Sequence, residues 1–112
     1  MAANILIVDD DESILELLRL HLSGAGYSVQ TATDAISAGY MVLRAVPDLI
    51  ITDISMPHMD GFEFVAALKA DKSLPEIPVV FLTSLEDGDH RGKELGADRL
   101  LDLVAQHVKS RA

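Results

Sequence analysis

The feature that most constrains this chain is a set of short, continuous apolar runs separated by segments of helical periodicity. Residues 4–8, 48–53 and 79–83 form three such runs, and β-branched side chains are frequent in them. Runs of this kind are typical of strands buried on both faces, as in a parallel sheet. Residues 27–32 instead alternate in the manner of a half-buried strand, which predicts four strands in all.

Segments with a helical pattern lie between these strands. The first begins near Ser13, places its apolar residues on one face and ends at Gly24. Thr33 or Asp34 is the expected cap of a second helix that extends to about residue 45, before Pro47.

A turn over residues 57–61 introduces a third helix, whose apolar residues include Phe62, Val65 and Leu68. Strands therefore alternate with helices four times, which predicts an α/β domain with a parallel sheet and right-handed crossovers. The chain of 112 residues has no internal repeat and no linker. Residues 1–112 are expected to form a single domain.

Composition excludes several classes of function. Eighteen acidic and nine basic residues give a net charge of −9, which argues against binding of nucleic acid by this domain. The absence of cysteine excludes disulfides, thiolate metal sites and cysteine nucleophiles. The sequence has no run long enough to span a membrane and no basic lead-in typical of a signal peptide, so a cytoplasmic location is expected.

Acidic and hydroxyl side chains follow the expected strands at their carboxyl ends. Asp9 and Asp10 end the first strand, Asp53 ends the third, and Thr83 and Ser84 end the fourth. In an open parallel sheet, ligands bind at this edge. Each aspartate alone is also a candidate helix cap. Three carboxylates brought together repel one another unless a cation joins them, and their hard oxygens suit Mg²⁺.

A carboxylate beside Mg²⁺ can attack a phosphoryl group and form an acyl phosphate. A hydroxyl such as that of Thr83 can donate a hydrogen bond to a phosphoryl oxygen. The residues therefore favour phosphoryl chemistry at this edge of the sheet.

Three segments resemble the response-regulator receiver domain of two-component signalling. Residues 5–11 resemble its first strand and acidic pair, residues 47–61 its phosphoacceptor strand and following loop, and residues 77–84 its fourth strand, although Ser84 stands where the family often has alanine. The resemblance implies a flavodoxin-like, doubly wound parallel sheet of strand order 2-1-3-4-5. It also implies a signalling phosphoacceptor rather than an enzyme.

The resemblance assigns roles to the site residues. Asp53 would receive a phosphoryl group from a sensor histidine kinase or a phosphotransfer protein. Asp10 and Asp53 would hold Mg²⁺, with Asp9 acting directly or through water and the backbone carbonyl of Ser55 completing the protein ligands. Thr83 would bond the phosphoryl group and move when it arrives.

The C-terminal part departs from the family pattern. After residues 96–98 the family continues with an aromatic residue, a fifth strand and a lysine followed by proline, whereas residues 99–104 here read RLLDLV. The favoured interpretation is loss of the fifth strand; in the alternative, residues 100–104 form it with Leu103 in the place of the lysine. Either way the site lacks an ammonium group, and we expect impaired signal output. Loss of the strand would also expose residues 79–82 as an edge for a dimer or a domain swap.

Other functions fit the sequence less well. A receiver-shaped protein-binding module, or a deletion variant without regulated phosphorylation, is the alternative that the missing lysine favours. A Mg²⁺-dependent phosphohydrolase would need a second acid where Ser55 stands, and a dinucleotide enzyme would need a glycine-rich turn after the first strand. His58 is expected to be an exposed loop residue, since no second histidine is spaced to share a metal with it.

Overall fold

The strands form one parallel sheet in the computed structural model, which describes residues 2–56 and 58–82. The strands are β1 (Asn4–Val8), β2 (Ser28–Ala32), β3 (Leu49–Thr52) and β4 (Val79–Phe81). Their spatial order is β2-β1-β3-β4, with each neighbouring pair parallel. The expected order 2-1-3-4 is confirmed. The residues on which the fifth strand depends lie outside the described part of the chain.

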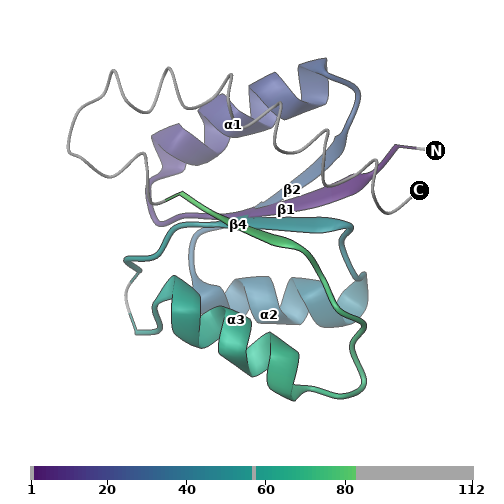
Figure 1. Cartoon of the computed structure of the whole chain (residues 1–112). Helices are drawn as coiled ribbons and strands as arrows, with labels where there is room; N and C mark the ends of the chain where they lie inside the picture. Colours follow the sequence, from purple (N-terminus) through teal and green to yellow (C-terminus); the bar gives the residue numbers. More distant parts are fainter. Residues whose placement is uncertain (1, 57, 83–112) are drawn as a thin grey trace.

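Helices cover both faces of the sheet. Helix α1 (Glu12–Gly24) lies on one face, and α2 (Ala35–Arg44) and α3 (Gly61–Ala70) lie on the other (Figure 1). This is the doubly wound arrangement, and it explains why the strands are apolar on both sides. Among the described residues, no helix combines the length and the apolar character needed to cross a lipid bilayer.

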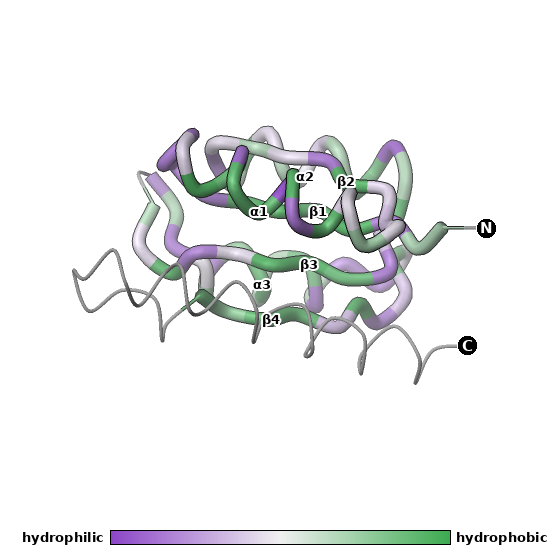
Figure 2. The backbone as a smooth tube through the Cα atoms, turned by 90° about the horizontal axis from the view of Figure 1, so that it is seen from above, coloured by the Kyte–Doolittle hydropathy of each residue, from purple (hydrophilic) through white to green (hydrophobic). Residues whose placement is uncertain are grey.

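The alternation of side chains along β1 divides the core into two layers. Ile5 and Ile7 pack with α1, whereas Leu6 and Val8 pack with α2 and α3. All four are nearly inaccessible to solvent. Figure 2 shows hydrophobic colour along β1, β3 and β4, as expected for strands with helices on both faces of their sheet.

Each of the described helices is preceded by an aspartate that caps it. Asp11 caps α1, and Asp34 caps α2 by accepting a hydrogen bond from the backbone N–H of Ser37 at 2.7 Å. Of the two predicted caps for α2, the structure therefore selects Asp34 over Thr33. Asp60 caps α3 in a reciprocal capping box with Glu63.

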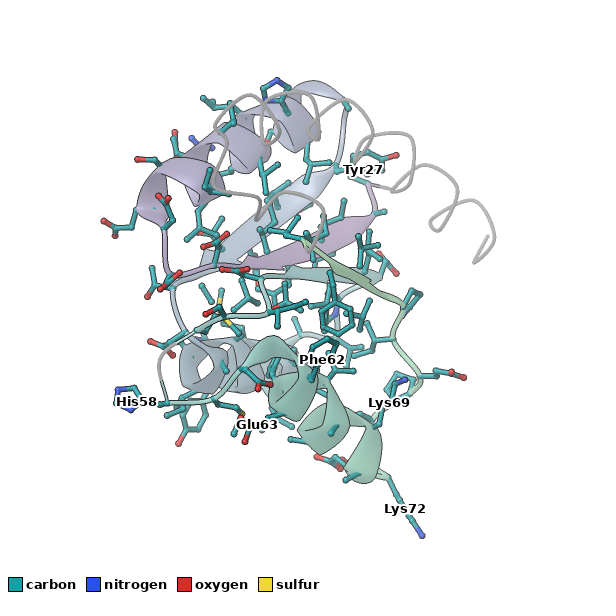
Figure 3. All side chains as sticks on the ribbon, turned by 60° about the vertical axis from the view of Figure 1, so that its left-hand side comes forward. Tyr27, His58, Phe62, Glu63, Lys69 and Lys72 are labelled. Atoms are coloured by element: carbon teal, nitrogen blue, oxygen red, sulfur yellow. The ribbon has the colours of Figure 1, made fainter. Side chains whose placement is uncertain are left out.

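The packed face of α3 differs in part from the apolar set that the sequence singled out. Phe64 is the buried aromatic residue, at 2% exposure, whereas Phe62 is 56% exposed. The ring of Phe62 instead lies against that of Phe81 on β4, with centroids 4.8 Å apart (Figure 3). Val65 is buried as expected, and Leu68 packs at the margin of the same core layer.

Candidate functional site: an acidic cluster at the carboxyl edge of the sheet

The strand ends are held in line by backbone hydrogen bonds. Val8 lies opposite Thr52 in the β1–β3 register. Directly beyond this pair, the N–H of Asp53 donates to the carbonyl oxygen of Val8 at 2.9 Å, and the N–H of Asp9 donates to that of Ala32 at 3.1 Å. The residues that follow β1 and β3 are therefore fixed side by side.

This alignment brings the three predicted metal ligands together. One carboxylate oxygen from each of Asp9, Asp10 and Asp53 lies within 4.8 Å of the others. Asp9 and Asp53 are buried, at 2% and 8% exposure, whereas Asp10 is exposed. The cluster thus has two buried carboxylates and one that is exposed to solvent.

Backbone N–H groups orient the two buried carboxylates. Oδ1 of Asp9 accepts from the N–H of Asp11 at 2.9 Å, and Oδ1 of Asp53 accepts from the N–H of Ile54 at 2.9 Å. The hydroxyl of Thr52 donates to the carbonyl oxygen of Asp53 at 2.9 Å in a buried environment. Side-chain and main-chain positions at Asp53 are therefore both constrained.

Helix capping does not account for this cluster. The cap of α1 is Asp11, whose carboxylate accepts from the N–H groups of Ser13 and Ile14. Asp9 and Asp10 precede the cap, and Asp53 lies in the loop before α3, whose cap is Asp60. The alternative interpretation of these three aspartates as caps is therefore wrong.

The loop between β3 and α3 closes tightly over the backbone at Asp53. The N–H of Gly61 donates to the carbonyl oxygen of Ile54 at 2.7 Å. A Cβ at position 61 would collide with the carbonyl oxygen of Asp53. The sequence predicts only a turn at this glycine and does not indicate the close approach. The spacing of Asp60 and Glu63 predicts the start of the helix, but the contact with Asp53 depends on how the loop packs.

The other residues that the sequence predicts at the site are not part of the acidic cluster. Ser55 is exposed and lies two residues after Asp53, but the ligand role of its carbonyl stays a prediction.

Thr83 and Ser84 lie outside the described residues. The last described residue before them, Leu82, donates its N–H to the carbonyl oxygen of Thr52 at 3.0 Å. His58 is exposed at the tip of the loop before α3, as expected, and has a positive φ of 71° (Figure 3).

The donor set fits a small, hard divalent cation. All three clustered side chains are carboxylates, and one of them reaches solvent, from which water ligands are available. Mg²⁺ prefers such sites, with a few carboxylate oxygens and retained water. A cation there would offset the mutual repulsion of the three carboxylates.

Comparison with known proteins identifies the family. Residues 5–104 match the response regulator receiver domain. The response regulator PleD of Caulobacter vibrioides is 44% identical over 103 residues, which are 90% of this chain and 23% of that protein. The DNA-binding dual master transcriptional regulator RpaA of Synechocystis is 39% identical over 87% of this chain and 41% of its own length. The chain therefore spans less than half of each of these relatives.

Solved structures agree with the fold. The signal receiver domain of a signal transduction histidine kinase from Syntrophus aciditrophicus has a TM-score of 0.81 at 30% identity, covering 97% of this chain and 92% of that one. The chemotaxis response regulator CheY4 of Vibrio cholerae has a TM-score of 0.80 at 31% identity, covering 96% and 99%. This chain thus belongs to the response regulator receiver domain family, the signalling phosphoacceptors of two-component systems.

Proposed function

We propose that residues 1–112 act as one receiver unit in which Asp53 accepts a phosphoryl group from the phosphohistidine of a sensor histidine kinase or a phosphotransfer protein. The observation that carries the proposal is the gathering of Asp9, Asp10 and Asp53 within 4.8 Å at the carboxyl edge of the sheet. Asp53 is the member of this cluster that follows β3, one of the two interior strands of the described sheet.

The transfer is a substitution at phosphorus. An oxygen of the Asp53 carboxylate attacks the phosphorus atom, the nitrogen–phosphorus bond of the donor breaks, and the imidazole leaves with the bonding electron pair and takes up a proton. The Ile54 N–H, at 2.9 Å from Oδ1 of Asp53, fixes the orientation of the attacking group. Bound Mg²⁺ would supply positive charge for the phosphoryl oxygens.

The other ligands are those that the resemblance to the receiver family implies. Asp9 and Asp10 would hold Mg²⁺ together with Asp53, and the carbonyl of Ser55 would complete the protein ligands. Thr83, which directly follows Leu82 at the end of β4, would donate its hydroxyl to a phosphoryl oxygen. The hydrogen bond from Leu82 to Thr52 supports this placement, because it keeps the end of β4 beside that of β3.

Signal output is proposed to be impaired. Residues 99–104 contain neither the lysine nor the proline of the family pattern, so the phosphoryl charge would be less well balanced. Within the described part of the chain β4 is an edge strand, and its pairing with a second copy is the associated proposal for a dimer or a domain swap.

Intact-mass spectrometry after incubation with Mg²⁺ and acetyl phosphate tests the proposal. We expect one added phosphoryl group on the wild type, none on Asp53→Asn, and none when Mg²⁺ is chelated. Asp71→Asn is the matched control, since Asp71 is a half-buried aspartate outside the cluster, and it should be modified like the wild type. Absence of the adduct from protein that is folded by circular dichroism would overturn the proposal and favour a receiver-shaped binding module without regulated phosphorylation.

A further inference from the structure

Exposed apolar side chains are concentrated on α2. Six large hydrophobic residues are exposed in the described part of the chain, and four of them lie on α2 or just after it: Ile36, Tyr40, Leu43 and Val46. The first three are 57%, 67% and 60% exposed, and their spacing places them on one face of the helix. The opposite face, with Ala35, Ala38 and Val42, is buried against the sheet. Helix α2 therefore has two apolar faces, although the sheet covers only one.

A groove runs beside this exposed stripe, between α2 and α3, which lie side by side on the same face of the sheet (Figure 1). It has a volume of about 270 Å³, and Phe64, Ala67 and Leu74 contribute to its apolar lining. Among the described residues that line it, Asp71 is the only charged one. In a chain with a net charge of −9, this surface is unusually poor in charge.

Gly39 lies in the lining of the groove and leaves a gap there, because it has no side chain. It lies in the middle of α2, where glycine weakens a helix relative to alanine. A Cβ at this position would meet no atom within 4 Å, so packing within the chain does not require glycine here. The gap instead leaves room for a side chain that arrives from outside.

The stripe is complementary to itself. In an antiparallel pair of α2 helices with a two-fold axis between residues 39 and 40, Ile36 faces Leu43 of the second copy and Tyr40 faces Gly39 of that copy. The large Tyr40 ring, 67% exposed, would thus meet the gap at Gly39. An isologous interface requires this kind of matching of one patch with itself.

The charges at the helix ends are complementary in the same arrangement. Asp34 caps the N-terminus of α2 and Arg44 is its last residue, so antiparallel pairing brings the acidic end of one helix to the basic end of the other. The backbone N–H of Ser37 holds the pKa of Asp34 below its ordinary value. The macrodipoles of the two helices also oppose each other favourably.

We propose that two copies of this chain associate through α2, packed antiparallel with Tyr40 of each copy over Gly39 of the other. A second copy is favoured because the exposed stripe and the gap at Gly39 occur on one face of α2, and because the two ends of this helix carry opposite charges. The low charge of this face lets two strongly acidic chains approach with little repulsion. The contact is independent of the acidic cluster and of the β4 edge.

Sedimentation velocity of the full chain over a range of concentrations tests the association. We expect a monomer–dimer equilibrium whose dissociation constant rises by about tenfold or more in Gly39→Gln, because the new side chain fills the gap. The variant has open space for its Cβ, and thermal unfolding should show it to be at least as stable as the wild type. Gly24→Gln is the matched control: it also has open space but lies at the end of α1, and its dissociation constant should not change.

Oxidative cross-linking tests the register, since the chain contains no cysteine of its own. A mixture of Ile36→Cys and Leu43→Cys proteins should form a disulfide-linked dimer faster than either protein alone or than Leu20→Cys, a residue with similar exposure on α1. Equal cross-linking in all samples would overturn the antiparallel register. A wild type that stays monomeric at millimolar concentration, or a dimer that Gly39→Gln leaves unchanged, would overturn the interface.

Discussion

The acidic cluster at the edge of the sheet and the groove between α2 and α3 are built by opposite means. In the cluster, backbone N–H groups orient Asp9 and Asp53, and the strand register sets their separation. In the groove, apolar side chains of two helices supply the lining, and a single charged residue, Asp71, takes part. One surface concentrates charge, and the other concentrates apolar area.

This difference determines how each region responds to substitution. Side chains in the cluster can change while the backbone that carries them stays intact, so their removal should alter chemistry more than stability. Side chains beneath the groove are part of the core, as Phe64 is, so their removal should alter stability more than chemistry. The backbone of the site is expected to be sensitive only where the chain approaches itself, at Gly61.

The largest effect is expected from Phe64→Ala. Phe64 is 2% exposed and packs in the core layer of α2 and α3, so truncation should lower the free energy of unfolding by about 3–5 kcal/mol. Phe62→Ala is the matched control on the same helix; its ring is 56% exposed and should lose only the contact with Phe81, about 0.5–1.5 kcal/mol. Urea denaturation measures the free energy of unfolding of both variants. Equal losses would contradict the distinction between the buried Phe64 beneath the groove and the exposed Phe62.

An intermediate effect is expected from Gly61→Ala. The added Cβ would collide with the carbonyl oxygen of Asp53, and the displacement should cost about 1–3 kcal/mol of unfolding free energy. The same substitution at Gly39 has open space and should stabilise the helix by about 1 kcal/mol. The midpoint of thermal unfolding should therefore fall in Gly61→Ala and rise in Gly39→Ala. A shift in the same direction would show that the close approach at Asp53 does not constrain residue 61.

Much of this architecture was predictable because β1 and β3 are buried on both faces and read as unbroken apolar runs. The positions of Asp9 and Asp53 followed from those runs, since the residue after a parallel strand must lie at the carboxyl edge. The order of the strands did not follow from periodicity; it came from the resemblance to the receiver family. The structure confirms both.

The choice of helix cap and the buried face of a helix depend on contacts in the folded chain, which a local sequence pattern does not show. Thr33 and Asp34 are both residue types that cap helices, and in the structure it is the side chain of Asp34 that accepts from the N–H of Ser37. Helix α3 is apolar on most sides, so its sequence does not distinguish Phe64 from Phe62. The exposed stripe on α2 was missed for the same reason: an apolar helix residue is expected in the core, and only the packed fold shows which face the sheet leaves uncovered.

The smallest effect on stability is expected from Asp10→Asn, which also compares the acidic cluster directly with the groove. Asp10 is the exposed member of the cluster, so without Mg²⁺ the loss of one negative charge should relieve repulsion and raise the free energy of unfolding by about 1 kcal/mol. With Mg²⁺ present, the wild type should gain thermal stability and the variant should gain much less, because one ligand is lost. Asp71→Asn removes the same charge at the groove and should leave the Mg²⁺-dependent gain unchanged. If Asp10→Asn destabilises the metal-free protein, the carboxylates do not repel one another in the folded chain, and a cation at this edge would have no repulsion to offset.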